Sequence, residues 1–180
     1  MKNRKIDFKI ENVHTKKGDN AYTVINGVKY RVRVETLILD KNNYVYAQKK
    51  DKMNQYGVYY KIPGGSVEPN LSFIEQAHAE VEEEARINPK NIRDSGIVYI
   101  QSYNGNYPEW QKKELWPLDC KCEGSVVMVF VAREGEKYTG YIKDEDKDSL
   151  YMYAKFYDAR ELDLRKSHKD AISWYLKNKF

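Results

Sequence analysis

Cysteine and long hydrophobic runs are scarce in this sequence. Its two cysteines, Cys120 and Cys122 among 180 residues, are too few for a disulfide-rich scaffold and too close together for an ordinary structural disulfide. The longest apolar run covers residues 126–132, whereas a membrane-spanning helix needs about 18 apolar residues or more. The first residues alternate polar and apolar side chains and lack the apolar segment of a secretory signal. We therefore expect a cytoplasmic protein with no membrane partner.

A dominant charge of one sign is also missing. The 31 basic and 27 acidic residues leave a net charge of +4, without the concentrated basic stripe typical of nucleic-acid-binding domains. The mean hydropathy of −0.82 resembles that of a disordered chain. However, aromatic residues make up 13% of the sequence, including 16 tyrosines, and disordered chains are poor in aromatic residues. The length and composition therefore predict one folded domain.

Strand patterns predominate along the chain. An Asn26-Gly27 pair inside residues 22–30 predicts a type I′ hairpin turn, and its second arm runs on to Leu39. The other expected strands cover residues 6–10, 44–47, 57–62, 97–100, 125–132 and 151–157. One helix is expected over residues 72–85, where Ser72 and Glu75 form a capping box, and a second over residues 165–177. The pattern predicts a single α+β domain.

Two loops are candidates for function. Residues 102–124 form a long polar and aromatic segment, and loops of that length in compact domains are usually functional or disordered. Its aromatic rings could stack on a purine base, although ordinary packing explains them equally well. The second loop, residues 144–148, is acidic and includes Glu145. A solvated turn is the simpler interpretation of such a charge block.

The helix expected over residues 72–85 carries the most informative pattern. It follows the pair Gly64-Gly65, and at about 100° per residue three glutamates of its second half share one ridge: Glu80, Glu83 and Glu84. Ile74, Ala77, Val81 and Ala85 form an apolar stripe expected to face the core, while Glu75 and Glu82 point to solvent.

The glutamate ridge is electrostatically unfavourable by itself. Like charges three and four residues apart repel each other, and the C-terminal half of a helix disfavours anions. A divalent cation would reverse both effects, because hard cations such as Mg²⁺ take oxygen ligands and keep room for a substrate phosphate. The ridge therefore predicts a metal site, and the alternative is an ordinary solvated acidic face.

With Gly65 as its first residue, this segment resembles the Nudix box, G-x5-E-x7-R-E-U-x-E-E-x-G-U, where U is a bulky aliphatic residue. Glu80, Val81, Glu83, Glu84 and Ile87 match the motif in register. Three positions depart from it: Leu71 replaces the first Glu, Ala79 the Arg, and Arg86 the closing Gly. In the family, this Glu and this Arg support the helix. Because both are replaced by apolar residues here, no partly buried charge is left without its partner.

The resemblance implies a Nudix fold, in which a mixed β-sheet lies sandwiched between helices. The order of strands and the final helix fit this fold. We expect residues 1–30 to form an N-terminal β-hairpin extension and residues 31–180 to form the Nudix hydrolase domain. The extension could either cap the sheet or mediate a homodimer.

The resemblance also implies an activity, the hydrolysis of a nucleoside diphosphate linked to another group. Mg²⁺ or Mn²⁺ would be held by Glu80, Glu83 and Glu84 with the Gly64 carbonyl, and would activate the attacking water. Glu80 and Glu83 are the catalytic candidates, and Glu145 is an alternative loop base. Gly65 and Tyr103 are the substrate-binding candidates.

The implied partner is a small nucleotide, with no nucleic acid except capped RNA. Nucleoside triphosphates, nucleotide sugars and dinucleoside polyphosphates fit equally well. The rival interpretation is a Nudix-fold nucleotide-binding or regulatory module whose catalysis lapsed when Leu71, Ala79 and Arg86 appeared. The retained glutamates favour the enzyme, because a pure binding module has little need for three crowded carboxylates.

Overall fold

A computed structural model describes residues 10–15, 18–52, 59–68, 70–102, 122–140 and 150–178. Within them lies a nine-stranded mixed sheet. Its strands are β1 (Ile10–Thr15), β2 (Gly18–Ile25), β3 (Val28–Leu39), β4 (Val45–Lys49), β5 (Tyr60–Lys61), β6 (Gly64–Ser66), β7 (Ile87–Ser102), β8 (Gly124–Lys137) and β9 (Lys155–Tyr157). The helices are α1 (Phe73–Glu80), a π-helical turn (Val81–Ala85), α3 (Leu150–Tyr153), a 3₁₀ turn (Ala159–Glu161) and α4 (Lys166–Lys177).

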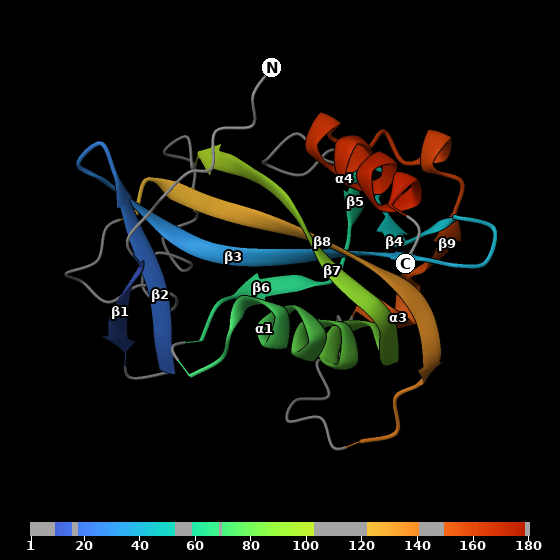
Figure 1. The fold of residues 1–180 in the computed structure, drawn as a ribbon, viewed down its shortest axis with the longest axis horizontal. Helices are drawn as coiled ribbons and strands as arrows, with labels where there is room; N and C mark the ends of the chain where they lie inside the picture. Colours follow the sequence, from blue (N-terminus) through green and yellow to red (C-terminus); the bar gives the residue numbers. More distant parts are fainter. Residues whose placement is uncertain are drawn as a thin grey trace.

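Strand β3 is central to the sheet (Figure 1). It pairs in parallel with β8 along most of its length, and antiparallel with β2, β4 and β6. Strand β8 in turn pairs antiparallel with β7, and β4 pairs antiparallel with both β5 and β9. This arrangement places the short strand β6 directly beside β3.

The helices α1 and α4 cover opposite faces of this sheet (Figure 1). Successive strand residues point to opposite faces, so Val32 and Val34 of β3 pack with Ala77 of α1. Leu37 and Leu39 belong to a second cluster, which includes Ala171 of α4. The predicted α+β fold, a mixed sheet sandwiched between helices with an N-terminal hairpin extension, is confirmed.

Several local predictions are also confirmed. Asn26 and Gly27 adopt positive φ angles of 51° and 80°, as a type I′ turn requires, and β3 continues to Leu39. Ser72 caps α1, and the helical segment ends after Ala85. The final helix, α4, covers nearly the range expected for it.

Other local predictions are wrong in part. Residues 151–157 are not one strand, because α3 occupies their first half and buries Leu150 before β9 begins. The strand predicted at residues 97–100 extends from Ile87 and contains Pro89. The pairing with β8 shifts register between Asn88 and Lys90, and such a bulge tolerates a proline that cannot donate a ladder hydrogen bond.

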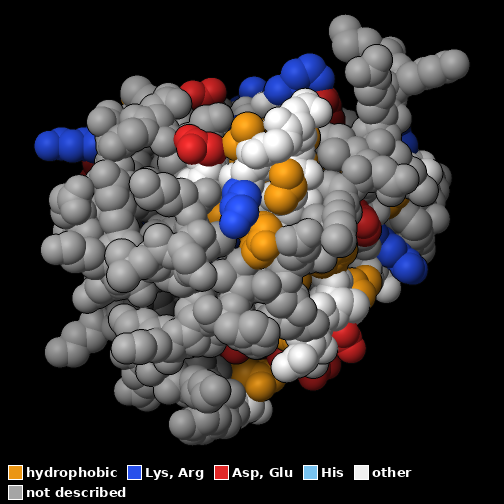
Figure 2. All heavy atoms as spheres, turned by 90° about the vertical axis from the view of Figure 1, so that its left-hand side faces the viewer, with side chains coloured by type: hydrophobic (Ala, Val, Ile, Leu, Met, Phe, Trp, Pro, Cys, Tyr) orange, Lys and Arg blue, Asp and Glu red, His pale blue; other side chains and the backbone are white. Residues whose placement is uncertain are grey.

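The N-terminal region also differs from expectation. The strand predicted at residues 6–10 overlaps β1 only at Ile10, and its remaining residues lie outside the described part of the chain. Figure 2 faces the end of the molecule that carries β1 and β2, where the coloured side chains mix hydrophobic residues with single charges of both signs. Among the described residues, no helix is long and apolar enough to cross a membrane. The division at residue 30 stays a prediction.

Candidate functional site

The site is built on α1, whose start is fixed by its cap. The Ser72 hydroxyl accepts a hydrogen bond from the Glu75 backbone N–H, and the Glu75 carboxylate accepts one from the Ser72 N–H at 2.8 Å. Ala77 and Val81 are fully buried. The capping box and the apolar stripe together hold the helix in one orientation against the sheet.

The apolar stripe differs from the sequence prediction at one end. Ile74 is 44% exposed, while the polar Gln76 is 4% exposed. Gln76 is buried because both ends of its amide are used: Oε1 accepts from the Glu68 N–H and Nε2 donates to Glu80 Oε1, each at 2.9 Å. Sequence reasoning missed Gln76, because nothing local distinguishes a polar residue that is bonded on both sides.

The glutamate-rich half of the helix is a π-helical turn covering Val81–Ala85. Such turns are rare and often occur at functional sites. Because a π turn is wider than an α turn, the regular spacing used for the ridge applies only up to Glu80. The turn ends at Arg86, whose φ of 57° is left-handed.

Glu80 lies against the backbone of β6. A Cβ built on Gly65 would stand 2.1 Å from Glu80 Oε1, so a side chain at this position would displace the carboxylate. Gly65 therefore allows the carboxylate to approach the backbone closely.

Glu84 contacts the neighbouring residue of the same strand. Its Oε2 accepts a hydrogen bond from the Gly64 N–H at 2.9 Å, and its Oε1 lies 3.5 Å from Lys61 Nζ. A Cβ on Gly64 would stand 2.4 Å from the Val34 carbonyl oxygen. The two glycines thus bring two carboxylates of the ridge to one short strand.

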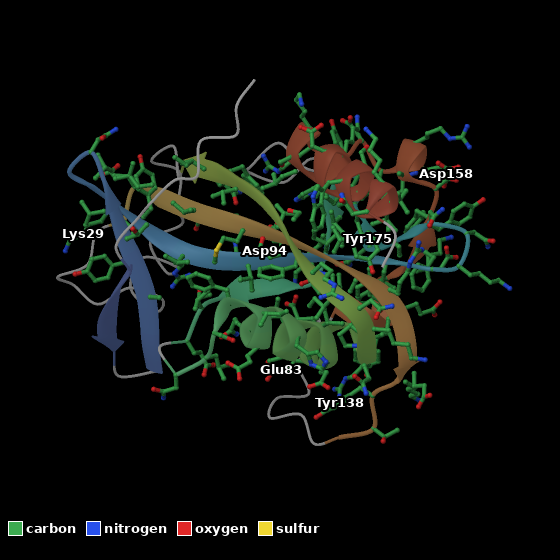
Figure 3. All side chains as sticks on the ribbon, viewed as in Figure 1. Lys29, Glu83, Asp94, Tyr138, Asp158 and Tyr175 are labelled. Carbon is green, nitrogen blue, oxygen red and sulfur yellow. The ribbon has the colours of Figure 1, made fainter. Side chains whose placement is uncertain are left out.

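Glu83, the third ridge residue, is exposed, and Figure 3 labels it beside the helix. Within the residues that the structure describes, no three His, Cys, Asp or Glu side chains are grouped closely enough to hold an ion. The structure therefore brings Glu80 and Glu84 together at β6 and leaves Glu83 toward solvent. The donor set nevertheless suits a hard cation, since it consists of carboxylate oxygens.

The ridge carries an electrostatic cost in the absence of a cation. Burial, followed by the charge of Glu84, raises the pKa of Glu80 to about 7, and Glu83 adds to this shift. The Gln76 hydrogen bond and Arg33 lower the pKa in part. A positive charge at this position would favour the ionised carboxylate, so the electrostatics of the ridge fit a bound cation.

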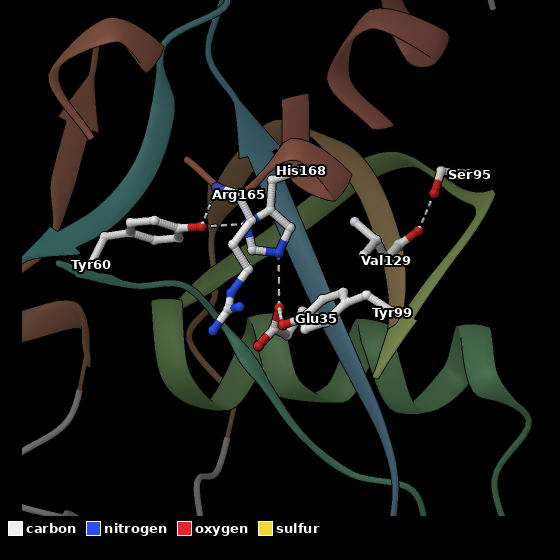
Figure 4. A network of polar contacts seen from close by, with 7 residues as sticks. All are labelled: Glu35, Tyr60, Ser95, Tyr99, Val129, Arg165 and His168. Carbon is white, nitrogen blue, oxygen red and sulfur yellow. Dashed lines mark hydrogen bonds and ion pairs between the residues drawn. The ribbon is translucent and has the colours of Figure 1, made fainter. Parts of the chain in front are cut away.

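A second polar cluster lies on the α4 side of the sheet (Figure 4). Glu35 Oε2 accepts a hydrogen bond from the Tyr99 hydroxyl at 2.7 Å and contacts His168 Nε2 at 2.9 Å. The other ring nitrogen of His168 is 2.7 Å from the Tyr60 hydroxyl. The Arg165 N–H donates to that same hydroxyl at 2.9 Å. We call these five residues the Glu35 network.

Glu35 remains ionised within this network. Burial alone would raise its pKa, but the hydrogen bond and charge of His168, with Arg33 and Tyr99, bring the pKa below its ordinary value of 4.5. Sequence reasoning missed the network, although two signals were available. Glu35 interrupts the apolar pattern of β3, and His168 stands on the buried face of α4 with Ala171 and Ile172.

Two predicted site residues, Tyr103 and Glu145, lie outside the described part of the chain, as do residues 103–121 and 141–149. Of the predicted set, the structure therefore gives positions for the glutamate ridge and the glycine pair alone.

Comparisons with known proteins agree with this architecture. The sequence model of the NUDIX domain matches residues 29–175. A solved NUDIX hydrolase from Nitrosomonas europaea shares 15% identity, with a TM-score of 0.54 over 83% of this chain and 90% of that one. The dihydroneopterin triphosphate pyrophosphohydrolase of E. coli shares 16% identity, with a TM-score of 0.53 over 82% of this chain and 96% of that one. No curated protein matches the sequence. At these identities, the structural likeness establishes the fold.

Proposed function

The chain belongs to the Nudix family, and from this membership we propose that it is a divalent-metal-dependent pyrophosphohydrolase. Its substrate would be a nucleoside diphosphate linked to another group. Members of the family generally hydrolyse such compounds with a divalent metal. The single observation that carries the proposal is the approach of Glu80 and Glu84 to β6, where Gly65 and Gly64 leave room for their carboxylates.

In this proposal Glu80, Glu83 and Glu84 hold Mg²⁺ or Mn²⁺, with the Gly64 carbonyl as a further ligand. When bound, the ion neutralises the diphosphate and lowers the pKa of a water molecule. Glu80 is held by Gln76 at 2.9 Å, which fixes one carboxylate oxygen and leaves the other for the ion. Glu83 faces solvent and is the better placed of the two catalytic candidates to accept a proton from an entering water.

Several parts of the assignment depend on family resemblance alone. Gly65 and Tyr103 as substrate contacts, and Glu145 as a loop base, stay predictions. Three further expectations stay predictions: capped RNA as a substrate and, from the sequence itself, a cytoplasmic location and a homodimer through the N-terminal hairpin. The mass from light scattering measures the last of these directly.

The test is a Mg²⁺-dependent hydrolysis screen with matched variants. Substrates are nucleoside triphosphates, nucleotide sugars, dinucleoside polyphosphates and capped RNA. For the substrate that turns over, we expect Glu83→Gln and Glu84→Gln each to lower kcat by about 100-fold or more, since metal-ligand losses remove several kcal/mol of transition-state stabilisation. Glu82→Gln is the control on the same turn, because Glu82 contacts His78 instead. Full activity in both ridge variants would contradict the mechanism.

A second candidate function is nucleotide binding without catalysis. The departures from the motif at Leu71, Ala79 and Arg86 favour it. It predicts that a nucleotide from the same panel raises Tm while no substrate is hydrolysed in Mg²⁺ or Mn²⁺. Turnover of any panel member that depends on Glu83 excludes this alternative.

A further inference from the structure

Arg165, the member of the Glu35 network at the start of α4, has a side chain that extends beyond it (Figure 4). Its backbone N–H is held by the Tyr60 hydroxyl at 2.9 Å. Its guanidinium carbon lies 5.2 Å from the centre of the Tyr99 ring. In Figure 4 the side chain extends from α4 toward the region of Glu35. The guanidinium thus lies on the α4 face of the sheet, over the Tyr99 ring.

The groups that support Arg165 are themselves fixed. The Tyr99 hydroxyl donates to Glu35 at 2.7 Å, and both tyrosine rings pack edge-on against His168 at 5.7 Å. His168 is 1% exposed. A guanidinium resting on such a support loses little conformational freedom when it binds a ligand, which is the condition for a pre-organised binding group.

The same groups connect to the glutamate ridge. Glu35 of β3 is the register partner of Gly64, and Arg33 is the partner of Ser66. Gly64 in turn donates its N–H to Glu84. The charge of Arg33 lowers the pKa of Glu80 in the ridge and of Glu35 and Tyr99 in the network, so one arginine of β3 acts on both groups.

We propose that Arg165 and Arg33 together bind one phosphate group of a nucleoside diphosphate derivative, namely the phosphate that the metal ion does not hold. This inference rests on the proposed function, because it extends the same site from the ridge to α4. A guanidinium presents a planar fork of donors that matches two phosphate oxygens. The start of a twelve-residue helix adds favourable partial charge for an anion. The negative charge of Glu35 would repel a phosphate, but its contacts with Tyr99 and His168 offset part of that repulsion.

The experiment measures the affinity of the chain for two probes, ADP and inorganic pyrophosphate. Both are titrated by calorimetry in the presence of Mg²⁺. Arg165→Gln is expected to raise the Kd of both probes roughly tenfold or more, the usual effect of losing a hydrogen bond to a charged group. Arg165→Lys keeps the charge without the fork, so a smaller increase is expected. The matched control is Arg160→Gln, an exposed arginine paired with Asp158, which leaves both Kd values unchanged.

A second readout separates binding from folding. The Kd of the wild-type chain rises with salt, and this dependence is weaker in Arg165→Gln if the guanidinium faces the phosphate. If Arg165→Gln does not fold, Arg165→Lys decides: an increased Kd supports the proposal and an unchanged Kd overturns it. An unchanged Kd in a folded Arg165→Gln variant also overturns it.

The ridge is tested separately with Mn²⁺ alone, by electron paramagnetic resonance. Arg165→Gln is expected to bind Mn²⁺ like the wild type, whereas the double variant Glu83→Gln, Glu84→Gln is expected to lose it. Loss of Mn²⁺ binding in Arg165→Gln would overturn the assignment of Arg165 to the phosphate. Unchanged Mn²⁺ binding in the ridge variant would instead contradict the proposed function.

Discussion

Arg86 shows how one backbone conformation can explain a motif position. It stands where the resembling motif has a glycine, and its φ of 57° is left-handed. That conformation costs an ordinary residue about 1–2 kcal/mol. The Arg86 carbonyl accepts a hydrogen bond from the Tyr138 N–H at 2.9 Å, so the turn is retained. The end of the helix thus requires a left-handed backbone conformation, which explains the glycine of the motif. Arg86 adopts this conformation at a cost in conformational free energy.

We therefore expect Arg86→Gly to stabilise the protein. The substitution removes the left-handed cost and the buried Nε atom, which has no hydrogen-bond partner among the described residues. It also removes the contact of the guanidinium with the Tyr151 ring at 4.9 Å, which is worth about 0.5–1 kcal/mol. The net gain is about 1 kcal/mol, or about 2–4 °C in Tm for a chain of this size.

Asn91→Gly is the control for this prediction, because Asn91 has a similar φ of 51° but asparagine tolerates it more easily. Both variants are compared by thermal unfolding. A lower Tm in Arg86→Gly would show that the Tyr151 contact outweighs the backbone cost.

At the scale of elements, α4 is held to the sheet by a polar group as well as by its apolar face. Its buried residues include Ala171, Ile172 and Tyr175, and His168 lies among them. The contact of His168 with Glu35 joins residues 133 positions apart in the sequence. A buried charge that loses its partner is strongly destabilising, so this contact makes the docking of α4 depend on protonation.

The direction of this dependence follows from Glu35. Burial raises its pKa, yet His168 and its neighbours bring it below 4.5. A lowered carboxyl pKa contributes stability that is complete above the unfolded-state value and is lost as the pH falls through the folded-state value. We therefore expect the Tm of the wild type to fall as the pH is lowered from 6 to 3.

His168→Gln tests this expectation. At pH 6 the variant should lose about 2–4 kcal/mol of unfolding free energy, since it breaks a buried charged contact. The difference from the wild type should be smaller at pH 3, because protonation of Glu35 becomes more favourable as the pH falls toward its lowered pKa. His78→Gln is the control, because His78 makes an exposed contact with Glu82 at 3.5 Å, worth little. A difference that is equal at both pH values, measured by chemical denaturation, would contradict the role of Glu35.

For the whole molecule, the proposed metal site links binding to stability. A ligand that binds only the folded state stabilises it by about 2.7 kcal/mol at 100 times its Kd. The ridge also repels itself without a cation, as the raised pKa of Glu80 indicates. We expect Mg²⁺ to raise the Tm of the wild type and of Glu82→Gln by several degrees. The double variant Glu83→Gln, Glu84→Gln should show no such shift at the same ionic strength.

Much of the fold could be predicted because its signals are local. The Asn26-Gly27 turn, the Ser72 capping box and the apolar run of β8 each depend on neighbouring residues. The site could be predicted only in part. The spacing of the glutamates indicated the ridge, but the π-helical turn changed its geometry and left Glu83 exposed.

The sequence by itself determined the strand and helix pattern, the family and the place of the acidic ridge, because these depend on residue type and short spacing. Only the tertiary structure decided which groups meet: Gly65 with Glu80, Gln76 with Glu68, and Glu35 with His168. The physical reason is that strand register and the docking of α4 bring distant segments together. A polar residue becomes buried or exposed only once those segments have packed.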